Sequence, residues 1–234
     1  MRRILTVISA LLLAAAPHAA ARPLFLPKGD LSAGAQLGFI NFSSEDSELF
    51  LLIDGMDAKA GFKRFAPFFE YAYADDRSFG FRMDYSILTA AVDNLTLDLL
   101  NDGLSFDLSG VSAKTRSAGA SIFHRNYFGL DERSRFAFFL EESLSYSSGR
   151  TQLDVGSGTD AFTSSSKLRL SFSPGFEFFV MNNISVGAYI SIGGVSYNRV
   201  SCHQGDAVTG SRQKFAARFG PDLLGAGFGV SFHF

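Results

Sequence analysis

The strongest constraint on the fold is a period of two in side-chain chemistry, which begins near Leu31 and continues to the C-terminus. Successive side chains of a β-strand point to opposite faces of a sheet, so this period is typical of strands whose two faces differ. The last run shows the pattern most clearly, with one face formed by Leu224, Ala226, Phe228, Val230, Phe232 and Phe234. No segment of comparable length has a helical period, and the sequence therefore predicts an all-β fold.

Clusters of Gly, Asn, Asp and Ser divide the alternation into eight runs. The predicted strands are residues 31–42, 62–74, 78–88, 112–127, 134–147, 166–180, 184–198 and 213–234. The connections after the second, fourth and sixth runs are short, whereas those after the odd-numbered runs are long. Short turns that alternate with long loops predict an antiparallel up-and-down arrangement of strands.

The two faces of the predicted strands indicate which side of the sheet is buried. Charged residues share their face with Gly and Ser, and the other face carries Phe, Ile and Leu. Small residues fit the lumen of a narrow barrel, and large apolar residues suit lipid, where an unpaired strand edge is not tolerated. We therefore predict an eight-stranded antiparallel up-and-down transmembrane β-barrel. A soluble, lipocalin-like barrel with its apolar face inside is the alternative.

The beginning of the chain has the pattern of a signal peptide. Arg2 and Arg3 precede an apolar run over residues 4–16, and small residues follow up to Ala21. We expect a signal peptide over 1–21 and a barrel domain over 22–234. The mature chain would hold 19 basic and 23 acidic residues, which does not suggest a nucleic-acid partner. Cys202 is the sole cysteine, so no internal disulfide can form.

One hairpin of the predicted barrel occurs twice. Residues of the second and third runs match residues of the sixth and seventh at a constant offset of 107. The matching pairs include Phe65 and Phe172, Pro67 and Pro174, Phe69 and Phe176, Glu70 and Glu177, and Ser78 and Ser185. The repeat indicates two halves of four strands each.

Nine charged residues are predicted to point into the lumen. They are Glu70, Arg82, Asp84, Arg125, Arg135, Glu141, Lys167, Arg169 and Glu177. A barrel of eight strands has room inside only for side chains, and buried charges persist only when they are paired. We therefore predict an ionic plug with a structural role, and a narrow passive channel for small solutes is the alternative.

Two places depart from the simple pattern. Glu142 falls on the face assigned to lipid, which is tolerable only near an interface. The alternation also slips between Phe219 and Leu224, around Gly220, and a β-bulge would account for this slip.

The long connection between the third and fourth runs is itself predicted to form a hairpin, over residues 92–111. Alternating residues flank an Asp-Gly turn, and the residues that define it are Leu97, Leu99, Asp102, Gly103, Leu104 and Phe106. A ribbon that protrudes from the barrel could bind an extracellular protein partner by strand addition, or it could only stiffen the loop.

Several motifs together resemble the small outer-membrane β-barrel family, whose members are described as porin-family, OmpA-like or OmpX-like. The resemblance is carried by the P-x-F-E hairpins, by IFHRNYF from Ile122, by FFLEESLSY from Phe138 and by the final GFGVSFHF. It implies a bacterial outer-membrane location with both termini periplasmic, in contact with lipid and lipopolysaccharide. It also implies a C-terminal signal for the barrel assembly machinery, which Gly229, Phe232 and Phe234 match.

Some barrels of this kind are lipid-modifying enzymes, which need a histidine beside a nucleophile and an orienting acid. His124, His203 and His233 lack, in the sequence, a nucleophile and an orienting acid at recognisable positions. No metal or cofactor motif is present either. We therefore expect a protein that is not an enzyme, with a structural or surface-interaction role through its long loops.

Overall fold

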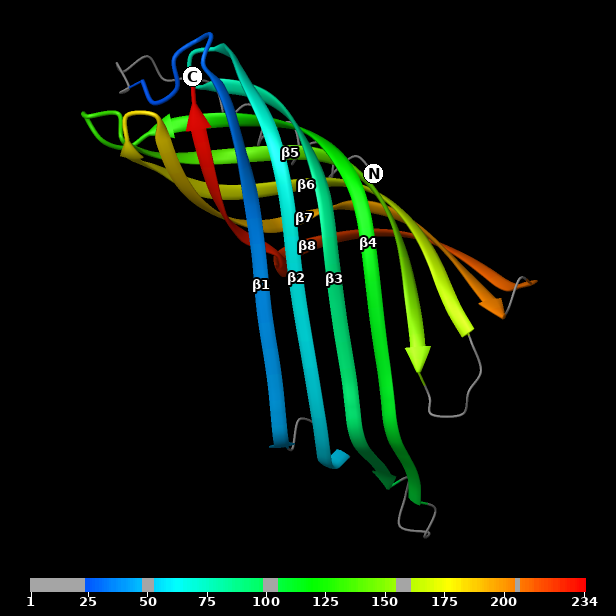
Figure 1. Ribbon diagram of the computed structural model, residues 1–234. Coiled ribbons are helices and arrows are strands. Elements are labelled where there is room, and N and C mark those ends of the chain that lie inside the picture. Colours follow the sequence, from blue (N-terminus) through cyan, green and yellow to red (C-terminus); the bar gives the residue numbers. More distant parts are fainter. Residues whose placement is uncertain (1–23, 48–52, 99–104, 155–160, 205–206) are drawn as a thin grey trace.

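The computed structural model describes residues 24–47, 53–98, 105–154, 161–204 and 207–234. The predicted signal peptide lies outside these residues. Eight antiparallel strands each pair with the next, and the last pairs with the first, so the sheet closes into a barrel (Figure 1). The predicted all-β, eight-stranded up-and-down topology is thereby confirmed. Within the described ranges, no helix has the length and apolar character needed to cross a membrane.

The strands are longer than predicted. They are β1 Leu31–Ser47, β2 Ile53–Ala74, β3 Arg77–Asp98, β4 Ser105–Gly129, β5 Phe136–Asp154, β6 Ala161–Met181, β7 Ile184–Gln204 and β8 Ala207–His233. The added residues lie mostly at the end of the barrel away from the termini. Backbone pairing continues there through residues that the sequence analysis assigned to the long connections.

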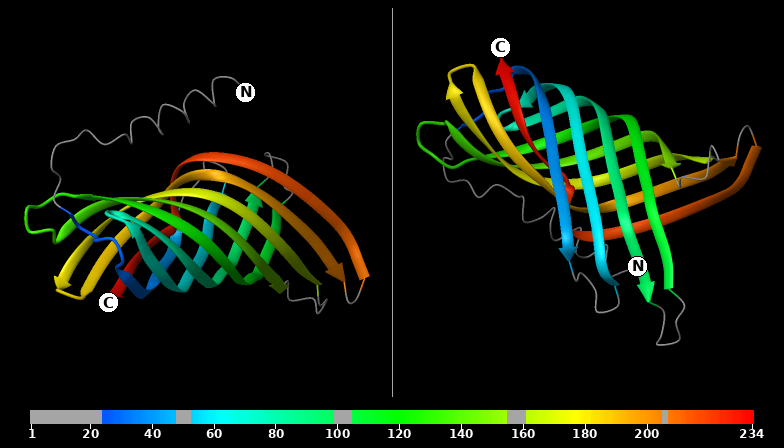
Figure 2. Two further views of the ribbon diagram at one scale, coloured as in Figure 1. Left: turned by 90° about the horizontal axis from the view of Figure 1, so that it is seen from above. Right: turned by 60° about the horizontal axis from the view of Figure 1, so that its bottom comes forward.

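The two ends of the barrel differ. The terminal end carries Leu31, His233 and the three tight connections that follow β2, β4 and β6. At the first of these, Asp76 has a φ of 57°, a left-handed conformation that Asp tolerates better than most residues. The opposite, distal end carries the connections after β1, β3, β5 and β7 (Figure 2).

The closure between β1 and β8 is short. The described pairing runs only from Ser32↔His233 to Leu37↔Phe228, whereas β3 and β4 pair over nearly their whole length. Figure 1 shows the consequence: toward the distal end, β8 swings away from β1. The two halves of four strands that the repeat indicates stay joined on their other side, because β4 and β5 pair from Gly129↔Ala137 to Ser112↔Asp154.

β8 also contains the predicted irregularity. Its residues Asp222 and Gly227 pair with Ser191 and Tyr189 of β7, so β8 has extra residues at this point. Gly220, beside this bulge, has a φ of 153°, which favours glycine. The slip in the alternation is therefore a real register shift.

The barrel has a polar inside and an apolar outside. Phe68 points inward and is 3% exposed, whereas its neighbour Phe69 is 64% exposed. The outer surface has many large apolar side chains of this kind, among them Leu37, Phe65, Tyr71, Phe79, Phe81, Met83, Ile122, Leu144, Leu170, Phe176, Phe178, Val186, Phe228 and Val230. The buried residues of the inner face are mostly Ser, Arg and Glu. This polarity is the reverse of a soluble barrel with an apolar core.

Glycines on the inner face make space for the rings that fill the lumen. A Cβ atom at Gly80 would lie 2.2 Å from the Phe123 ring, and one at Gly175 would lie 2.3 Å from the Phe139 ring. The alternating glycines of the inner face are thus needed for packing, and the two rings lie against the charged cluster described next.

Candidate functional site: the charged cluster in the lumen

The centre of the lumen is the guanidinium of Arg125 on β4, which is buried. Its Nε donates to Oε2 of Glu141 on β5 at 2.9 Å, and its Nη1 donates to Oε2 of Glu70 on β2 at 2.7 Å. All three side chains are at most 4% exposed. Three strands thus bring opposite charges together in a space closed to solvent.

Arg82 on β3 completes this arrangement. Its two terminal nitrogens donate to the two carboxylate oxygens of Glu141 at 2.9 and 2.6 Å. A two-point contact of this kind fixes both side chains and is stronger than a bond between neutral groups. Glu141 therefore accepts bonds from two guanidiniums on neighbouring strands.

The repeated hairpin supplies the third acid. Glu177 on β6 lies 3.9 Å from Arg125 and accepts a hydrogen bond from the Tyr127 hydroxyl at 3.2 Å. Ser185 donates to Glu177, and Ser78 donates to Glu70. The two bonds join residues related by the same offset of 107, so the repeat preserves a contact as well as a pattern. We call Glu70, Arg82, Arg125, Glu141 and Glu177 the lumen cluster.

His233 extends the lumen cluster toward the terminal end. Its Nε2 lies 2.9 Å from the Ser185 hydroxyl and 3.7 Å from Glu177, and its Nδ1 lies 2.8 Å from Asp30. The lumen cluster contains three carboxylates and two guanidiniums, so His233 adds a basic group on the side where acids are in excess. The sequence analysis assigned no such role to His233.

Aromatic rings enclose the central guanidinium. The Arg125 carbon Cζ lies 4.8 Å from the ring centres of Phe123 and Phe139 and 5.3 Å from that of Phe68. A cation over a ring face is attracted to it, and the interaction strengthens where water is excluded. The rings also occupy the space through which water would reach the charges.

A second, apolar layer lies at the terminal end, which sequence analysis missed. Phe25 and Leu26 precede β1 and are 3% and 2% exposed. Their backbone N–H groups donate to the Asp76 carboxylate at 2.8 and 2.9 Å, and the Phe25 ring stacks on Tyr127 with centres 5.3 Å apart. We call residues 24–30 the N-terminal stopper. The apolar triplet that begins at Leu24 was the available signal, although it lies outside any alternating run.

The remaining predicted lumen charges lie elsewhere. Asp84 pairs with Arg64, an inward residue that sequence analysis passed over although the alternation places it inside. Arg169 pairs with Asp222 at 3.0 Å. Lys167 lines a cavity beside Arg169, on the distal side of the lumen cluster. These residues share the inner face but form separate contacts.

The prediction for Arg135 was wrong. The alternation along β5 would place the Arg135 side chain inside the barrel, but β5 begins one residue later, at Phe136. The Asp131 carboxylate accepts hydrogen bonds from the backbone N–H groups of both residues, at 2.8 and 2.7 Å, and so turns the chain here. Arg135 is consequently exposed in the connection before the strand.

The outer face carries a polar group that sequence analysis also missed. His124 Nδ1 lies 3.1 Å from Glu142, and its Nε2 lies 2.9 Å from the Tyr73 hydroxyl. An acid that orients a histidine beside a hydroxyl is the arrangement of a nucleophile and its base, contrary to our expectation that no such pairing exists. The group gives the predicted lipid-facing Glu142 a partner.

The other predicted sites are placed as follows. Phe232 and Phe234 are 46% and 78% exposed, and Gly229 faces Gln36 inside the barrel. Leu97 pairs with Phe106 in the ribbon, while Leu99, Asp102, Gly103 and Leu104 lie outside the described residues. In the described part of the chain, no group of three or more His, Cys, Asp or Glu side chains is arranged to hold a metal ion.

Glu141 and Glu142 offer a matched test of the lumen cluster, because they are neighbours on opposite faces of β5. Changing Glu141→Gln is expected to lower the free energy of unfolding by about 3–5 kcal/mol, since the buried Arg82 guanidinium loses its carboxylate and Arg125 loses one of its carboxylates. Glu142→Gln, at a half-exposed pair, is expected to cost about 1 kcal/mol or less. Urea unfolding of the protein in lipid vesicles measures both, and equal losses would contradict the assignment.

Solved structures of low sequence identity are similar to this chain. No model of a known protein family matches the sequence, and no match is found among curated proteins. Among solved structures, Neisserial surface protein A has 19% identity and a TM-score of 0.39, covering 88% of this chain and 100% of its own. The outer membrane protein OprG from Pseudomonas aeruginosa has 15% identity and a TM-score of 0.39, covering 89% of this chain and 98% of its own. The fold itself is defined by the closed ring of strand pairs described above.

Proposed function

We propose that this protein is a bacterial outer-membrane barrel with a closed lumen, and that it has a structural and surface-interaction role. The observation that carries the proposal is the lumen cluster, in which five consecutive strands contribute buried and mutually paired charges. The N-terminal stopper adds an apolar layer on the terminal side. A solute that crossed the barrel would have to separate ion pairs and displace this layer.

The outer surface supports a membrane location. A belt of exposed Phe, Tyr, Leu and Met side chains surrounds the barrel, and a belt of this size would be costly in water. On the distal side of the belt, four exposed basic residues follow it on separate strands: Lys63, Arg116, Arg150 and Arg199. The first three lie on one row of strand pairs, through Lys63↔Ile87, Ile87↔Arg116 and Arg116↔Arg150.

We call these four residues the basic girdle, and it supports an orientation for the barrel. Basic side chains that follow an apolar belt lie at the level of lipid head groups. The phosphates of lipopolysaccharide provide a dense anionic layer in the outer leaflet, and they would pair with the girdle. The distal end then faces the cell exterior, and both termini are periplasmic.

The native cysteine, compared with a cysteine introduced at the other end of the barrel, tests this orientation. Cys202 lies near the distal end of β7 and is exposed. A membrane-impermeant maleimide is expected to label it in intact cells. A protein with Glu132→Cys and Cys202→Ser, whose cysteine lies in the terminal-end turn, should react only after the outer membrane is made permeable. The reverse pattern would refute the orientation.

Conductance measurements in planar bilayers test the closed lumen. Folded protein is expected to add no single-channel steps, because the lumen cluster and the stopper both obstruct the path. A variant with Arg82→Gly, Glu141→Gly, Phe25→Gly and Leu26→Gly removes parts of both layers and should conduct. The pair His124→Gly and Glu142→Gly on the outer face is the control. Regular steps from the unaltered protein would favour the passive channel instead.

The surface-interaction role is assigned to the ribbon at the distal end of β3 and β4. The two strands stay paired from Val92↔Val111 to Asp98↔Ser105, as expected from the sequence. The outer edge of β3 is covered by β2 as far as Ile53↔Leu97, so the ribbon is less free than expected. Within the described ranges, pairing of β4 with β5 begins only at Ser112↔Asp154.

The edge of β4 over residues 105–111 therefore offers backbone groups to an extended segment of an extracellular protein. Replacing residues 95–108 by Asn-Gly is expected to leave a heat-modifiable, folded barrel. It should also reduce the adhesion of expressing cells to protein-coated surfaces. Adhesion that persists unchanged in this variant would exclude the ribbon as the binding element.

A further inference from the structure

Three arginines of the basic girdle lie close together on the outer face, and we call Arg116, Arg150 and Arg199 the arginine patch. Arg116 on β4 pairs directly with Arg150 on β5. Arg150 pairs with Ser164 on β6, and Ser164 pairs with Ser201 on β7, two residues from Arg199. All three arginine side chains are exposed. Strand pairing therefore gathers three guanidiniums on one continuous piece of sheet.

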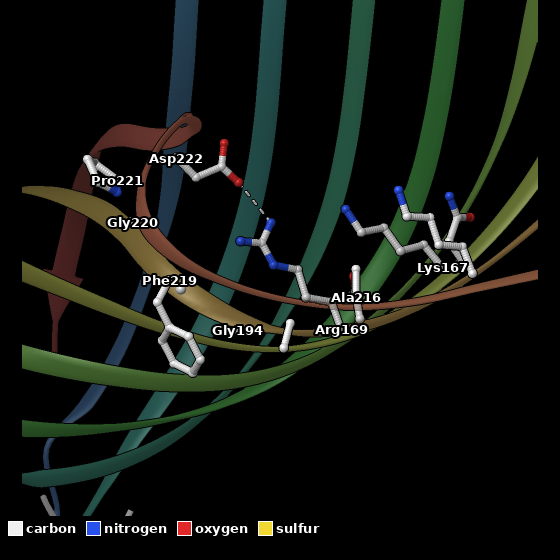
Figure 3. A pocket seen from close by; sticks show the side chains of 13 residues that line it. Lys167, Arg169, Gly194, Ala216, Phe219, Gly220, Pro221 and Asp222 are labelled. Atoms are coloured by element: carbon white, nitrogen blue, oxygen red, sulfur yellow. Dashed lines mark hydrogen bonds and ion pairs between the residues drawn. The ribbon is translucent and has the colours of Figure 1, made fainter. Parts of the chain in front are cut away.

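The alternation along β6 shows that the arginine patch and the lumen lie on opposite sides of this sheet. Figure 3 shows Lys167 and Arg169 on the inner side, where Arg169 donates to Asp222 at 3.0 Å. Leu168, between them, is 46% exposed on the outer side. Ser164 is an even number of residues from Leu168 and therefore shares its side. A ligand of the patch would be reached from the membrane and not from the lumen.

The charge of the arginine patch has no partner among the described residues. None of the described residues that face or flank the three arginines on the outer side is an acid. Within the same ranges, no carboxylate forms an ion pair with the three guanidiniums. Like charges directly opposite each other in an antiparallel pair repel, and Arg116 and Arg150 are such a pair. An anion bound between them would remove this repulsion.

Arg150 is held in position before any ligand binds. Its carbon Cζ lies 3.6 Å from the ring centre of Phe162. The Phe162 ring stacks on that of His203, with centres 4.6 Å apart, and His203 Nε2 lies 2.9 Å from the Ser164 hydroxyl. A guanidinium over a ring keeps the N–H groups at its edge available to an anion. Because Arg150 is already restrained, binding would cost less conformational entropy.

An apolar row borders the arginine patch on its terminal side. Tyr146, Leu168 and Tyr197 pair with one another across β5, β6 and β7, and they are 56%, 46% and 42% exposed. The next outward pair toward the distal end is Ser148↔Ser166, whose small side chains leave the sheet accessible. A ligand at this place would meet charge on one side and apolar surface on the other. An amphiphile with an anionic head group has this character, and a soluble anion does not.

We infer that the arginine patch binds one glycolipid that carries two phosphates, which is the head-group chemistry of lipopolysaccharide. One phosphate would lie between Arg116 and Arg150, and the second would lie at Arg199. The backbones of Arg150 and Arg199 are roughly 12 Å apart, because they are separated by two strand spacings and by two residues along β7. A disaccharide with a phosphate at each end covers a separation of this order. Guanidinium groups bind phosphate by paired hydrogen bonds, which favours arginine at such a site.

The inference rests on the proposed outer-membrane location, which places lipopolysaccharide beside the distal part of the outer face. It adds that one lipid is bound at a defined site, with its acyl chains against Tyr146 and Leu168, whereas the rest of the basic girdle only adjoins the head-group layer. Binding to purified protein depends neither on whether the lumen conducts nor on the orientation of the barrel. The site and the proposed function can therefore fail separately.

Native mass spectrometry of the full-length folded protein in detergent micelles tests the inference, with bis-phosphorylated lipid A as the probe. We expect one bound lipid per barrel, held about tenfold more tightly than monophosphorylated lipid A, because one charge-assisted contact is lost with the second phosphate. Arg199→Gln should weaken binding of the bis-phosphorylated lipid about tenfold and leave that of the monophosphorylated lipid unchanged. Arg150→Gln should weaken both.

Arg133→Gln is the matched control, because it removes the same exposed charge from the connection at the terminal end. It should leave both affinities unchanged, and a loss equal to that in Arg150→Gln would overturn the inference. A deacylated, bis-phosphorylated disaccharide that bound as tightly as the lipid would also overturn it, since the apolar row would then contribute nothing. Conductance steps would refute the closed lumen without altering lipid binding. A closed barrel that did not distinguish the two lipids would refute the inference alone.

Discussion

The burial of the Arg125 guanidinium is the interaction on which the rest of the barrel depends. A cation enclosed by three aromatic rings needs carboxylates within reach, and Glu70 and Glu141 provide them from the second strand before and the strand after. A shift of one residue in any of these strands would turn its charge toward the outer face. The lumen cluster therefore fixes the register of the central strands, and with it the position of the apolar belt.

The repeat explains how one cluster can join two halves of a barrel. Glu70 and Glu177 come from equivalent hairpins, each with its own serine donor, and both lie within 4 Å of Nη1 of Arg125. At the terminal end the halves are further joined by the stopper and by short pairing between β1 and β8. Among the described residues, β1 and β8 pair no further than Leu37↔Phe228, whereas β4 and β5 stay paired as far as Ser112↔Asp154.

Much of this architecture could be predicted from residue type and from the alternation of side chains between the two faces of a strand. The alternation places Phe68 and Phe69 on opposite faces, and the repeat places Glu70 and Glu177 in equivalent positions. The alternation does not predict the direction of a side chain where a strand ends, as at Arg135, because hydrogen bonds to the Asp131 carboxylate decide where β5 begins. It also fails for segments outside the strands, and for this reason the burial of Phe25 was missed.

Contacts between strands were less predictable than the strands themselves. The pairing of His124 with Glu142 depends on the register of β4 against β5, which neither strand specifies alone. The early end of the pairing between β1 and β8, at Leu37↔Phe228, was likewise not predictable. The sequence period indicated the bulge in β8, but it contains no information about how far two strands stay paired.

The direction in which adjacent side chains point is the central claim, and fluorescence quenching tests it directly. The protein has no Trp, so a single Trp introduced by substitution is an unambiguous reporter. Phe69→Trp and Phe68→Trp differ by one position on β2 and are compared in vesicles of dibrominated phosphatidylcholine. The structure predicts strong quenching for Phe69→Trp and little for Phe68→Trp, and the opposite result would contradict the account.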